Sequence, residues 1–316
     1  FSRNKRISYI SVAHEQSAAM MADAYSRMGP NFSCTMVTSG PGATNLITGI
    51  ACSYFDSIPA LHICGQVNTF EQKDASTSTK KVRQIGFQET EIVEIAKPIT
   101  KYSYKLKSPY EIRYVLEKAY HIATNGYPGA VHLSLPVDIM FSSFAEEVGL
   151  EERPFSHKAK PLAKAWPEPN TLSEVLELAC NSKKPIIIGG HGVWWSHSEK
   201  NLEAAGNNLN IPIFNVPYHQ KLLGEEANAY MGLADIHQYP PSEYALQNSD
   251  LVLVVGARLD NQMNFGNPPF IPESTKLVCV NGSHEELELN RAADLSLLSD
   301  PGVFLDTLSN LSLIHI

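Results

Sequence analysis

The sequence lacks the features that mark membrane proteins, disulfide-stapled domains and nucleic-acid binders. No apolar run approaches the roughly 20 residues that a membrane-spanning helix needs, and nothing near its start resembles a signal peptide. The five cysteines form no CxxC pair, which argues against a disulfide framework or a zinc site and favours the reducing cytoplasm. The net charge is −8 without a basic stripe, so we expect no nucleic-acid partner.

What is present is an alternation of helical stretches with short β-branched runs. The 316 residues suffice for two domains with separate cores. The first half predicts helices at 15–28, 43–55 and 109–125 and strands at 33–38, 60–64 and 130–135. The second half predicts helices at 171–180 and 198–208 and strands at 185–189, 211–214, 250–255 and 275–280. This pattern indicates an α/β fold with two doubly wound domains and mainly parallel sheets.

The stretch 149–168 interrupts the alternation. It is rich in proline, glutamate and lysine and has no apolar period, which is typical of an interdomain linker. We therefore predict a first domain over 1–148 and a second over 169–310. Segments 68–86 and 260–274 fit no regular element, and the polar first one is expected to form a long loop.

Two short segments could carry chemistry, although each has an ordinary structural explanation. Glu15 begins a predicted helix, where an acidic side chain complements the helix dipole. Residues 38–45 form a glycine-rich turn between a strand and a helix, where free amides can bind a ligand. This turn matches neither the Walker nor the dinucleotide fingerprint. Taken singly, neither segment assigns a function.

Taken in order, however, several motifs closely resemble the acetolactate synthase-like family of thiamine-diphosphate-dependent enzymes. The matching strings are Ala13-His-Glu-Gln16, Ala22-Asp-Ala-Tyr-Ser-Arg27, Ser39-Gly-Pro-Gly-Ala-Thr-Asn45, Gly65-Gln-Val67, Gly86-Phe-Gln-Glu-Thr90, Lys97-Pro-Ile-Thr-Lys101, Gly126-Tyr-Pro-Gly129 and Gly256-Ala-Arg-Leu-Asp260. The resemblance spans nearly the whole chain. It implies a pyrimidine-binding first domain followed by a Rossmann-like central domain.

The resemblance also implies a role for particular residues. Glu15 is expected to hydrogen-bond the aminopyrimidine of thiamine diphosphate and so promote proton loss from the thiazolium carbon, which then attacks a 2-keto acid. The residues expected to line the aminopyrimidine side are Thr38, Pro41, Gly42 and Asn45, and those expected to face the reaction space are Phe87 and the catalytic Gln88. We further expect a dry pocket to raise the pKa of Glu15, because burial disfavours the charged carboxylate.

By the same resemblance, part of the enzyme lies outside this chain. The family binds Mg²⁺ through a GDG…NN segment of a third domain, whereas this sequence contains no GDG and Asn207-Asn208 lies on a predicted helix. The chain begins after the point where the family's first strand and helix should lie, and residues 311–316 resemble a translated sequencing adaptor. We expect no metal site in the chain, no activity from the chain alone, and an active homodimer or homotetramer.

The substrate is less well determined because the sequence departs from strict acetolactate synthases. Pro136-Val137-Asp138 replaces Pro-Lys-Asp, Ile236-His237-Gln238 replaces Met-His-Gly, and Asp260-Asn261-Gln262 replaces an Asp-Asp-Arg whose arginine helps select the second keto acid. Glutamine cannot grip a carboxylate as an arginine fork does, which makes carboligation onto a second keto acid, and with it a bound FAD, doubtful. Residues 264–269 resemble 2-hydroxyacyl-CoA lyases instead.

Three functions therefore stay open. The first is a carboligase or decarboxylase that acts on a 2-keto acid, and the second is a 2-hydroxyacyl-CoA lyase or oxalyl-CoA decarboxylase-like enzyme that acts on an acyl-CoA. The third is a non-catalytic Rossmann-type binding protein. Among the other conspicuous side chains, we expect His132 to be a core histidine and Trp194 to pack rather than stack on an adenine.

Overall fold

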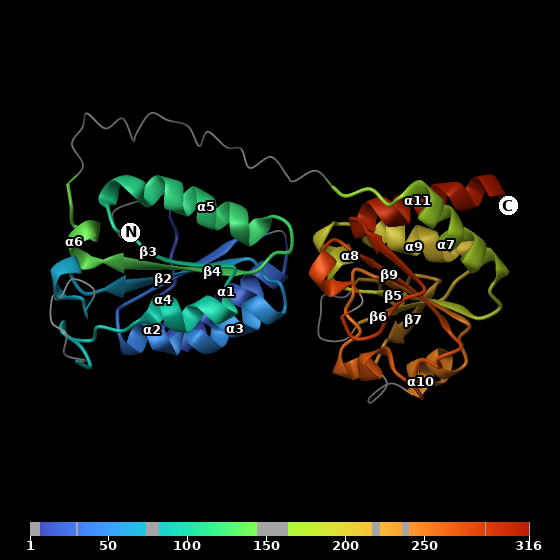
Figure 1. The fold of residues 1–316 in the computed structure, drawn as a ribbon, viewed down its shortest axis with the longest axis horizontal. Coiled ribbons are helices and arrows are strands. Elements are labelled where there is room, and N and C mark those ends of the chain that lie inside the picture. Colours follow the sequence, from blue (N-terminus) through green and yellow to red (C-terminus); the bar gives the residue numbers. More distant parts are fainter. Residues whose placement is uncertain are drawn as a thin grey trace. The chain divides into compact units, whose positions relative to one another are not determined.

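The computed structural model divides the chain into two compact units, residues 1–162 and 163–316, and both are α/β domains (Figure 1). The structure describes residues 7–29, 31–73, 82–143, 164–216, 222–235, 240–287 and 289–315. The division falls within the stretch 149–168, of which residues 149–163 lie outside the described ranges.

The first unit is built on a four-stranded sheet in the order β1-β2-β4-β3. Its strands are β1 (Ser33–Val37), β2 (Ala60–Gln66), β3 (Tyr102–Lys105) and β4 (Ala130–Pro136). All three pairings are parallel, and β4 is buried along its whole length. That burial is typical of a parallel sheet, because its strands are covered on both faces. The parallel α/β fold is thus confirmed for this half.

Helices cover both faces of this sheet (Figure 1). The helices of the unit are α1 (Glu15–Arg27), α2 (Pro41–Asn45), α3 (Ile47–Phe55), α4 (Ile92–Ala96), α5 (Ile112–Thr124) and α6 (Val137–Met140). The helix α5 packs Val115 and Ala119 against Leu133 on one face, whereas Ala19 and Ile50 pack with Ala130 on the other. The alternation of buried side chains along β4 thus separates the two layers.

Several predicted boundaries in this unit are wrong. The helix predicted at 43–55 is two helices, and Leu46 is the capping residue between them. The first helix begins earlier than predicted, at Pro41. The helix predicted at 109–125 begins with a 3₁₀ turn at Pro109–Glu111. A second 3₁₀ turn, Thr69–Glu71, interrupts the predicted loop. The short elements α4, β3 and α6 were missed because four or five residues carry too little periodicity.

A polar row crosses the buried sheet of the first unit. Thr35, His62, His132 and Ser103 are register partners on the four adjacent strands. The Thr35 Oγ1 lies 2.9 Å from His62 Nδ1, and Ser103 Oγ lies 3.0 Å from His132 Nδ1. Burial lowers the pKa of His62 to about 3 and that of His132 to about 4, so both rings are neutral. His132 is therefore the core histidine that the sequence predicts.

The second unit has a six-stranded sheet in the order β10-β9-β8-β5-β6-β7, again with parallel pairing throughout. Its strands are β5 (Pro185–Gly189), β6 (Ile213–Asn215), β7 (Tyr230–Leu233), β8 (Leu251–Val255), β9 (Lys276–Asn281) and β10 (Leu295–Leu298). The strand order reverses between β5 and β8, as in doubly wound folds. The chain comes back to β8 beside β5, so these strands form the centre of the sheet.

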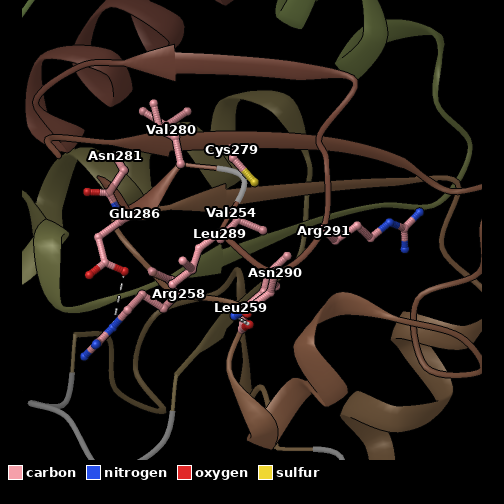
Figure 2. Close-up of a pocket in the computed structure, with 12 residues that line it drawn as sticks. Val254, Arg258, Leu259, Cys279, Val280, Asn281, Glu286, Leu289, Asn290 and Arg291 are labelled. Atoms are coloured by element: carbon pink, nitrogen blue, oxygen red, sulfur yellow. Dashed lines mark hydrogen bonds and ion pairs between the residues drawn. The ribbon is translucent and has the colours of Figure 1, made fainter. Parts of the chain in front are cut away.

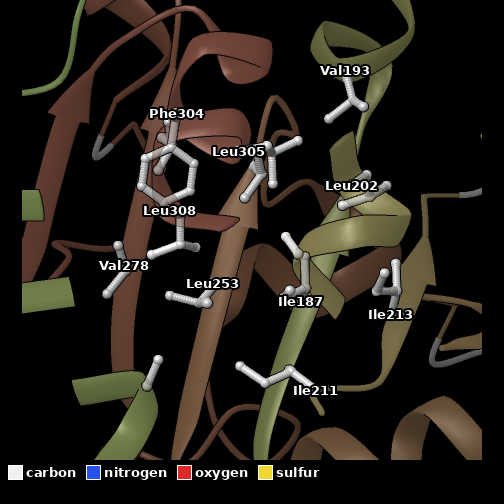
Figure 3. Close-up of a cluster of buried hydrophobic side chains, with 14 of the residues drawn as sticks. Ile187, Val193, Leu202, Ile211, Ile213, Leu253, Val278, Phe304, Leu305 and Leu308 are labelled. Carbon is white, nitrogen blue, oxygen red and sulfur yellow. The ribbon is translucent and has the colours of Figure 1, made fainter. Parts of the chain in front are cut away.

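The helices of the second unit are α7 (Pro169–Asn181), α8 (His191–Trp195), α9 (Glu199–Leu209), α10 (Pro240–Gln247) and α11 (Pro301–His315). In its larger core, Phe304 and Leu308 of α11 pack over Val278 and Leu253 (Figure 3). Trp194 joins this core, which supports packing over adenine stacking. Asn208 donates a hydrogen bond to Ser309 Oγ at 2.8 Å, so it links α9 to α11.

The elements of this unit that were not predicted from the sequence are α8, α10, α11, β7 and β10, and the strand predicted at 211–214 begins only at Ile213. In the segment predicted as irregular, Asn261–Gly266 form 3₁₀-type turns that are interrupted by non-helical backbone at Met263, Asn264 and Phe265. The origin of residues 311–316 stays a prediction. Among the described helices, none combines the length and the apolar character that crossing a membrane requires.

The neutral histidine pair predicts acid sensitivity of the first unit. Between pH 6.5 and about 4, the unfolded chain binds protons at both histidines while the folded chain does not. The free energy of unfolding should therefore fall as the pH falls, by about 1.4 kcal/mol per pH unit for each histidine. Urea unfolding followed through hydrogen exchange of the β4 amides measures this slope.

The double variant His62→Asn/His132→Asn should lose most of the slope, even where its stability near pH 7 is lower. His121 is an exposed histidine of α5, and the matched variant His121→Asn should keep the slope. An unchanged slope in the double variant would contradict the assignment.

Candidate functional site

The candidate site lies at the carboxyl end of β1 in the first unit. Glu15 opens α1, after His14, whose Nδ1 accepts the backbone N–H of Gln16 at 3.2 Å. Thr38 follows β1 directly, and Asn45 ends the next short helix, α2. The Asn45 side-chain amide donates a hydrogen bond to Glu15 Oε2 at 3.0 Å. The fold thus joins two predicted site residues that lie 30 positions apart.

Gly42 packs closely beside the other oxygen of the Glu15 carboxylate. If Gly42 carried a Cβ, that atom would lie 3.2 Å from Glu15 Oε1 and 2.7 Å from the Thr38 methyl carbon. Because the second distance is a clash, only glycine permits the turn to lie this close to Thr38 and Glu15. The structure therefore brings Glu15, Thr38, Gly42 and Asn45 together, as the sequence predicts, and Pro41 begins the helix that carries two of them.

Gln88 packs against the same turn from the other side. A Cβ on Gly40 would lie 2.6 Å from Gln88 Cβ and 2.9 Å from its carbonyl oxygen, so only glycine permits this contact. Both residues have positive φ, +60° at Gly40 and +65° at Gln88. Phe87, by contrast, is 81% exposed, and its side chain is not part of the cluster. Gln88 is thus placed beside the predicted cofactor residues through its backbone.

The electrostatics of Glu15 differ from the sequence expectation. The hydrogen bond from Asn45 lowers the pKa of the Glu15 carboxyl, with a further contribution from its own backbone N–H. The prediction of a raised pKa is wrong for this chain, because the carboxyl is partly exposed and burial has only a weak opposing effect. Glu15 is a stabilised carboxylate in the state that the structure describes.

Two further carboxylates shape this edge of the sheet. Asp138, at the start of α6, accepts hydrogen bonds from Thr69 N at 3.1 Å and Thr69 Oγ1 at 2.5 Å, and so joins the ends of β2 and β4. Burial raises the pKa of Asp138, but the Thr69 bonds prevail and lower it overall. Glu89 is buried directly after Gln88. Neither Asp138 nor Glu89 was given a role from the sequence alone. The signal that could have found them is an acidic residue directly after a strand or a turn.

A second, smaller site lies at the carboxyl ends of β8 and β9 in the second unit. Figure 2 shows Arg258 reaching toward Glu286, with 3.8 Å between Nε and Oε2. The pocket beside them has a volume of about 20 Å³. In doubly wound sheets nucleotides bind at the switch point, which lies here between β5 and β8, whereas this pocket lies at β8 and β9. Its volume holds little more than a water molecule.

Comparison with known protein families agrees with this arrangement. Residues 1–95 match the thiamine pyrophosphate enzyme N-terminal TPP binding domain, and residues 172–308 match the central domain of the same enzymes. Together the two matches cover well over half of the chain. The chain belongs to the thiamine pyrophosphate enzyme family. The Glu15 cluster lies in the part that matches the TPP binding domain of this family, and the small pocket lies in the part that matches the central domain.

Individual relatives within the thiamine pyrophosphate enzyme family give the same result. The chain is 32% identical to the acetolactate synthase large subunit of Lactococcus lactis over 297 residues, which are 93% of this chain and 48% of that relative. It is 30% identical to the acetolactate synthase large subunit of Cyanidium caldarium, over 97% of this chain and 50% of that relative. The chain thus spans about half the length of the curated relatives it matches.

A solved structure supports the fold of this family member. Benzoylformate decarboxylase from Polynucleobacter necessarius aligns with a TM-score of 0.80 at 22% identity, over 98% of this chain and 55% of that one. Similarity at this identity concerns the fold, and it agrees with the parallel sheets described above.

The Glu15–Asn45 contact predicts a titration change. Replacing Asn45 by alanine removes the amide that stabilises the carboxylate, so the pKa of Glu15 should rise relative to the wild-type chain. NMR titration of the Glu15 carboxyl carbon measures this. Asn31→Ala removes an amide that donates to the Tyr25 carbonyl instead, and it should leave Glu15 unchanged. Equal titration curves for wild type and Asn45→Ala would contradict the contact.

Proposed function

We propose that this chain carries the cofactor-activating part of a thiamine-diphosphate-dependent enzyme that acts on a 2-keto acid, as a carboligase or decarboxylase. The observation that carries the proposal is the Glu15 carboxylate, which accepts a hydrogen bond from Asn45 on Oε2 and is partly exposed. The acetolactate synthases among its relatives favour the carboligase. The benzoylformate decarboxylase fold is compatible with either reaction.

The residues around Glu15 fit an aminopyrimidine ring. The Oε2 atom is already hydrogen-bonded to Asn45, which orients the carboxyl plane. The Oε1 atom lies beside Gly42, and the Glu15 side chain is partly exposed. A ring nitrogen that reaches Oε1 from the exposed side could share a proton with the carboxyl.

The chain's own chemistry is to hold a proton at Oε1. Thiamine diphosphate, when bound, supplies an acidic thiazolium carbon that adds to the substrate carbonyl and a ring that accepts the bonding electrons. Glu15 shares a proton with the aminopyrimidine and thereby favours loss of the thiazolium proton. Because the hydrogen bond from Asn45 lowers the pKa of Glu15 in this partly exposed site, covering the site must raise its pKa into the useful range. Gln88 packs on Gly40 beside this cluster, and we propose that its amide orients the substrate carbonyl.

The other ligands of the family fit this chain less well. By resemblance, the diphosphate and its Mg²⁺ are held by residues beyond those in this chain, so no Mg²⁺ ligand is proposed here. The pocket in the second unit, with its volume of about 20 Å³, does not fit a flavin or an adenine ring. No step of the proposed reaction is therefore assigned to FAD.

The decisive variant is Glu15→Gln in the full-length protein with thiamine diphosphate and Mg²⁺. An amide cannot share the carboxyl proton, so proton exchange at the thiazolium carbon should slow by roughly 100-fold or more. Exchange into deuterated water, read by NMR, measures this rate. Glu94→Gln changes an exposed glutamate of α4 and should keep the wild-type rate.

A wild-type exchange rate in Glu15→Gln would remove Glu15 from the activation, whereas a wild-type protein that does not accelerate the exchange would favour the non-catalytic binding protein. Turnover of an acyl-CoA rather than a 2-keto acid by the wild type would favour the lyase alternative.

We also propose that two or more copies of the chain assemble through α1. Met21 and Tyr25 of α1, and Met28 directly after it, recur at helical spacing, and all three are exposed. Contiguous exposed apolar patches mark protein interfaces, whereas single exposed apolar residues do not.

Negative charges introduced at Met21 and Tyr25 should disrupt this assembly. The variant Met21→Glu/Tyr25→Glu places two like charges on each copy, so the full-length protein should sediment at a lower mass than the wild type. Sedimentation equilibrium measures the mass. Tyr114 of α5 is 65% exposed, and Tyr114→Glu should keep the wild-type mass. The same mass for all three proteins would rule out α1 as the interface.

A further inference from the structure

A buried carboxylate with no part in the proposed chemistry lies directly after Gln88. The Glu89 side chain is 7% exposed. Its Oε1 accepts the backbone N–H of Lys73 at 2.6 Å, and its Oε2 accepts that of Ile85 at 2.7 Å. A buried charge is unfavourable unless hydrogen bonds satisfy it, and each of these charge-assisted bonds is short. The Glu89 side chain is therefore held in one place by two separate points of the main chain.

The same carboxylate belongs to a closed turn over residues 86–89. The Glu89 N–H donates to the Gly86 carbonyl at 3.1 Å, and the Gly86 N–H donates to the Glu71 carbonyl at 2.8 Å. On its far side, the Thr90 carbonyl accepts the side-chain amide of Gln66 at 2.8 Å. The turn is thus anchored at both ends to the segment that leaves β2.

Gln88 occupies a conformation that this framework must enforce. Its φ of +65° lies in the left-handed region, which is unfavourable for a residue with a side chain by about 1 kcal/mol or more. In this conformation the Gln88 backbone packs on Gly40, at the turn that leads into Gly42 and Asn45. A relaxed φ at Gln88 would move its side chain away from this turn.

We propose that Glu89 is a positioning residue for Gln88. Its carboxylate ties Lys73 and Ile85 to the 86–89 turn and so keeps Gln88 at positive φ against Gly40. Glu89 is not a catalytic residue, because both of its oxygens are engaged by backbone N–H groups. The inference rests on the proposed function, since it concerns the contribution of Gln88 to that reaction.

The test is Glu89→Gln in the full-length protein, loaded with thiamine diphosphate and Mg²⁺ and supplied with a 2-keto acid such as pyruvate. Glutamine keeps the size of the side chain but turns an amide group toward one of the two N–H donors, so one anchor is lost. Hydrogen exchange at the Lys73 or Ile85 amide should accelerate. The kcat should fall roughly 10- to 100-fold with little change in KM, as expected for a misplaced group at a reacting centre.

Three comparisons separate positioning from general damage. Proton exchange at the thiazolium carbon depends on Glu15 and should keep its wild-type rate in Glu89→Gln. Gln88→Ala should reproduce the kcat defect with normal amide exchange at Lys73 and Ile85, and the double variant should be no slower than Gln88→Ala. Glu91 is exposed in the same segment, and Glu91→Gln should match the wild type throughout.

Three results overturn the role of Glu89 and leave the proposed function untouched. They are an unchanged kcat in Glu89→Gln, a loss of thiazolium proton exchange in parallel with kcat, and additive losses in the double variant. A wild-type protein that shows no thiazolium proton exchange overturns the proposed function, and this inference with it.

Discussion

Parallel pairing of β1, β2 and β4 is the constraint on which the candidate site depends. Parallel strands end at the same edge of a sheet, so the segments after these three strands converge although they are far apart in sequence. The turn at 38–45, the turn at 86–89 and Asp138 all follow that edge. The helix α1 adds Glu15 from a different direction, through the hydrogen bond with Asn45. The sheet topology therefore sets the position of the site, and the individual side chains set its chemistry.

Two glutamates at this edge show how environment separates the roles of one side-chain type. Glu89 is buried, and both of its oxygens accept backbone N–H groups, so this side chain stabilises the main chain around it. Glu15 is partly exposed and accepts a hydrogen bond from Asn45 on one oxygen, so the carboxyl is accessible to a ligand. The difference lies in the surroundings of the oxygens, because those of Glu89 are buried and hydrogen-bonded to the main chain.

Polar groups within the sheet of the first unit have a role that differs from those of Glu15 and Glu89. The row from Thr35 through His62 and His132 to Ser103 lies on the face toward α1 and α3, where an apolar layer is otherwise expected. Hydrogen bonds to hydroxyl groups keep these histidines tolerable in the core, but only as neutral rings. The domain that carries the candidate site is thus built with a dependence on pH that is separate from the chemistry of Glu15.

The sequence by itself determined the α/β class, the principal strands and the family, because hydrophobic periodicity and ordered motifs are local properties of the chain. It also predicted His132 as a core residue and the membership of Glu15, Thr38, Gly42 and Asn45 in one site. Short elements such as β3 and α8 escaped it, since they are stabilised by neighbours rather than by their own pattern. Only the tertiary structure decided the lowered pKa of Glu15, the exposure of Phe87 and the burial of Glu89. These properties depend on which groups surround a side chain in space, and residues distant in sequence supply those groups.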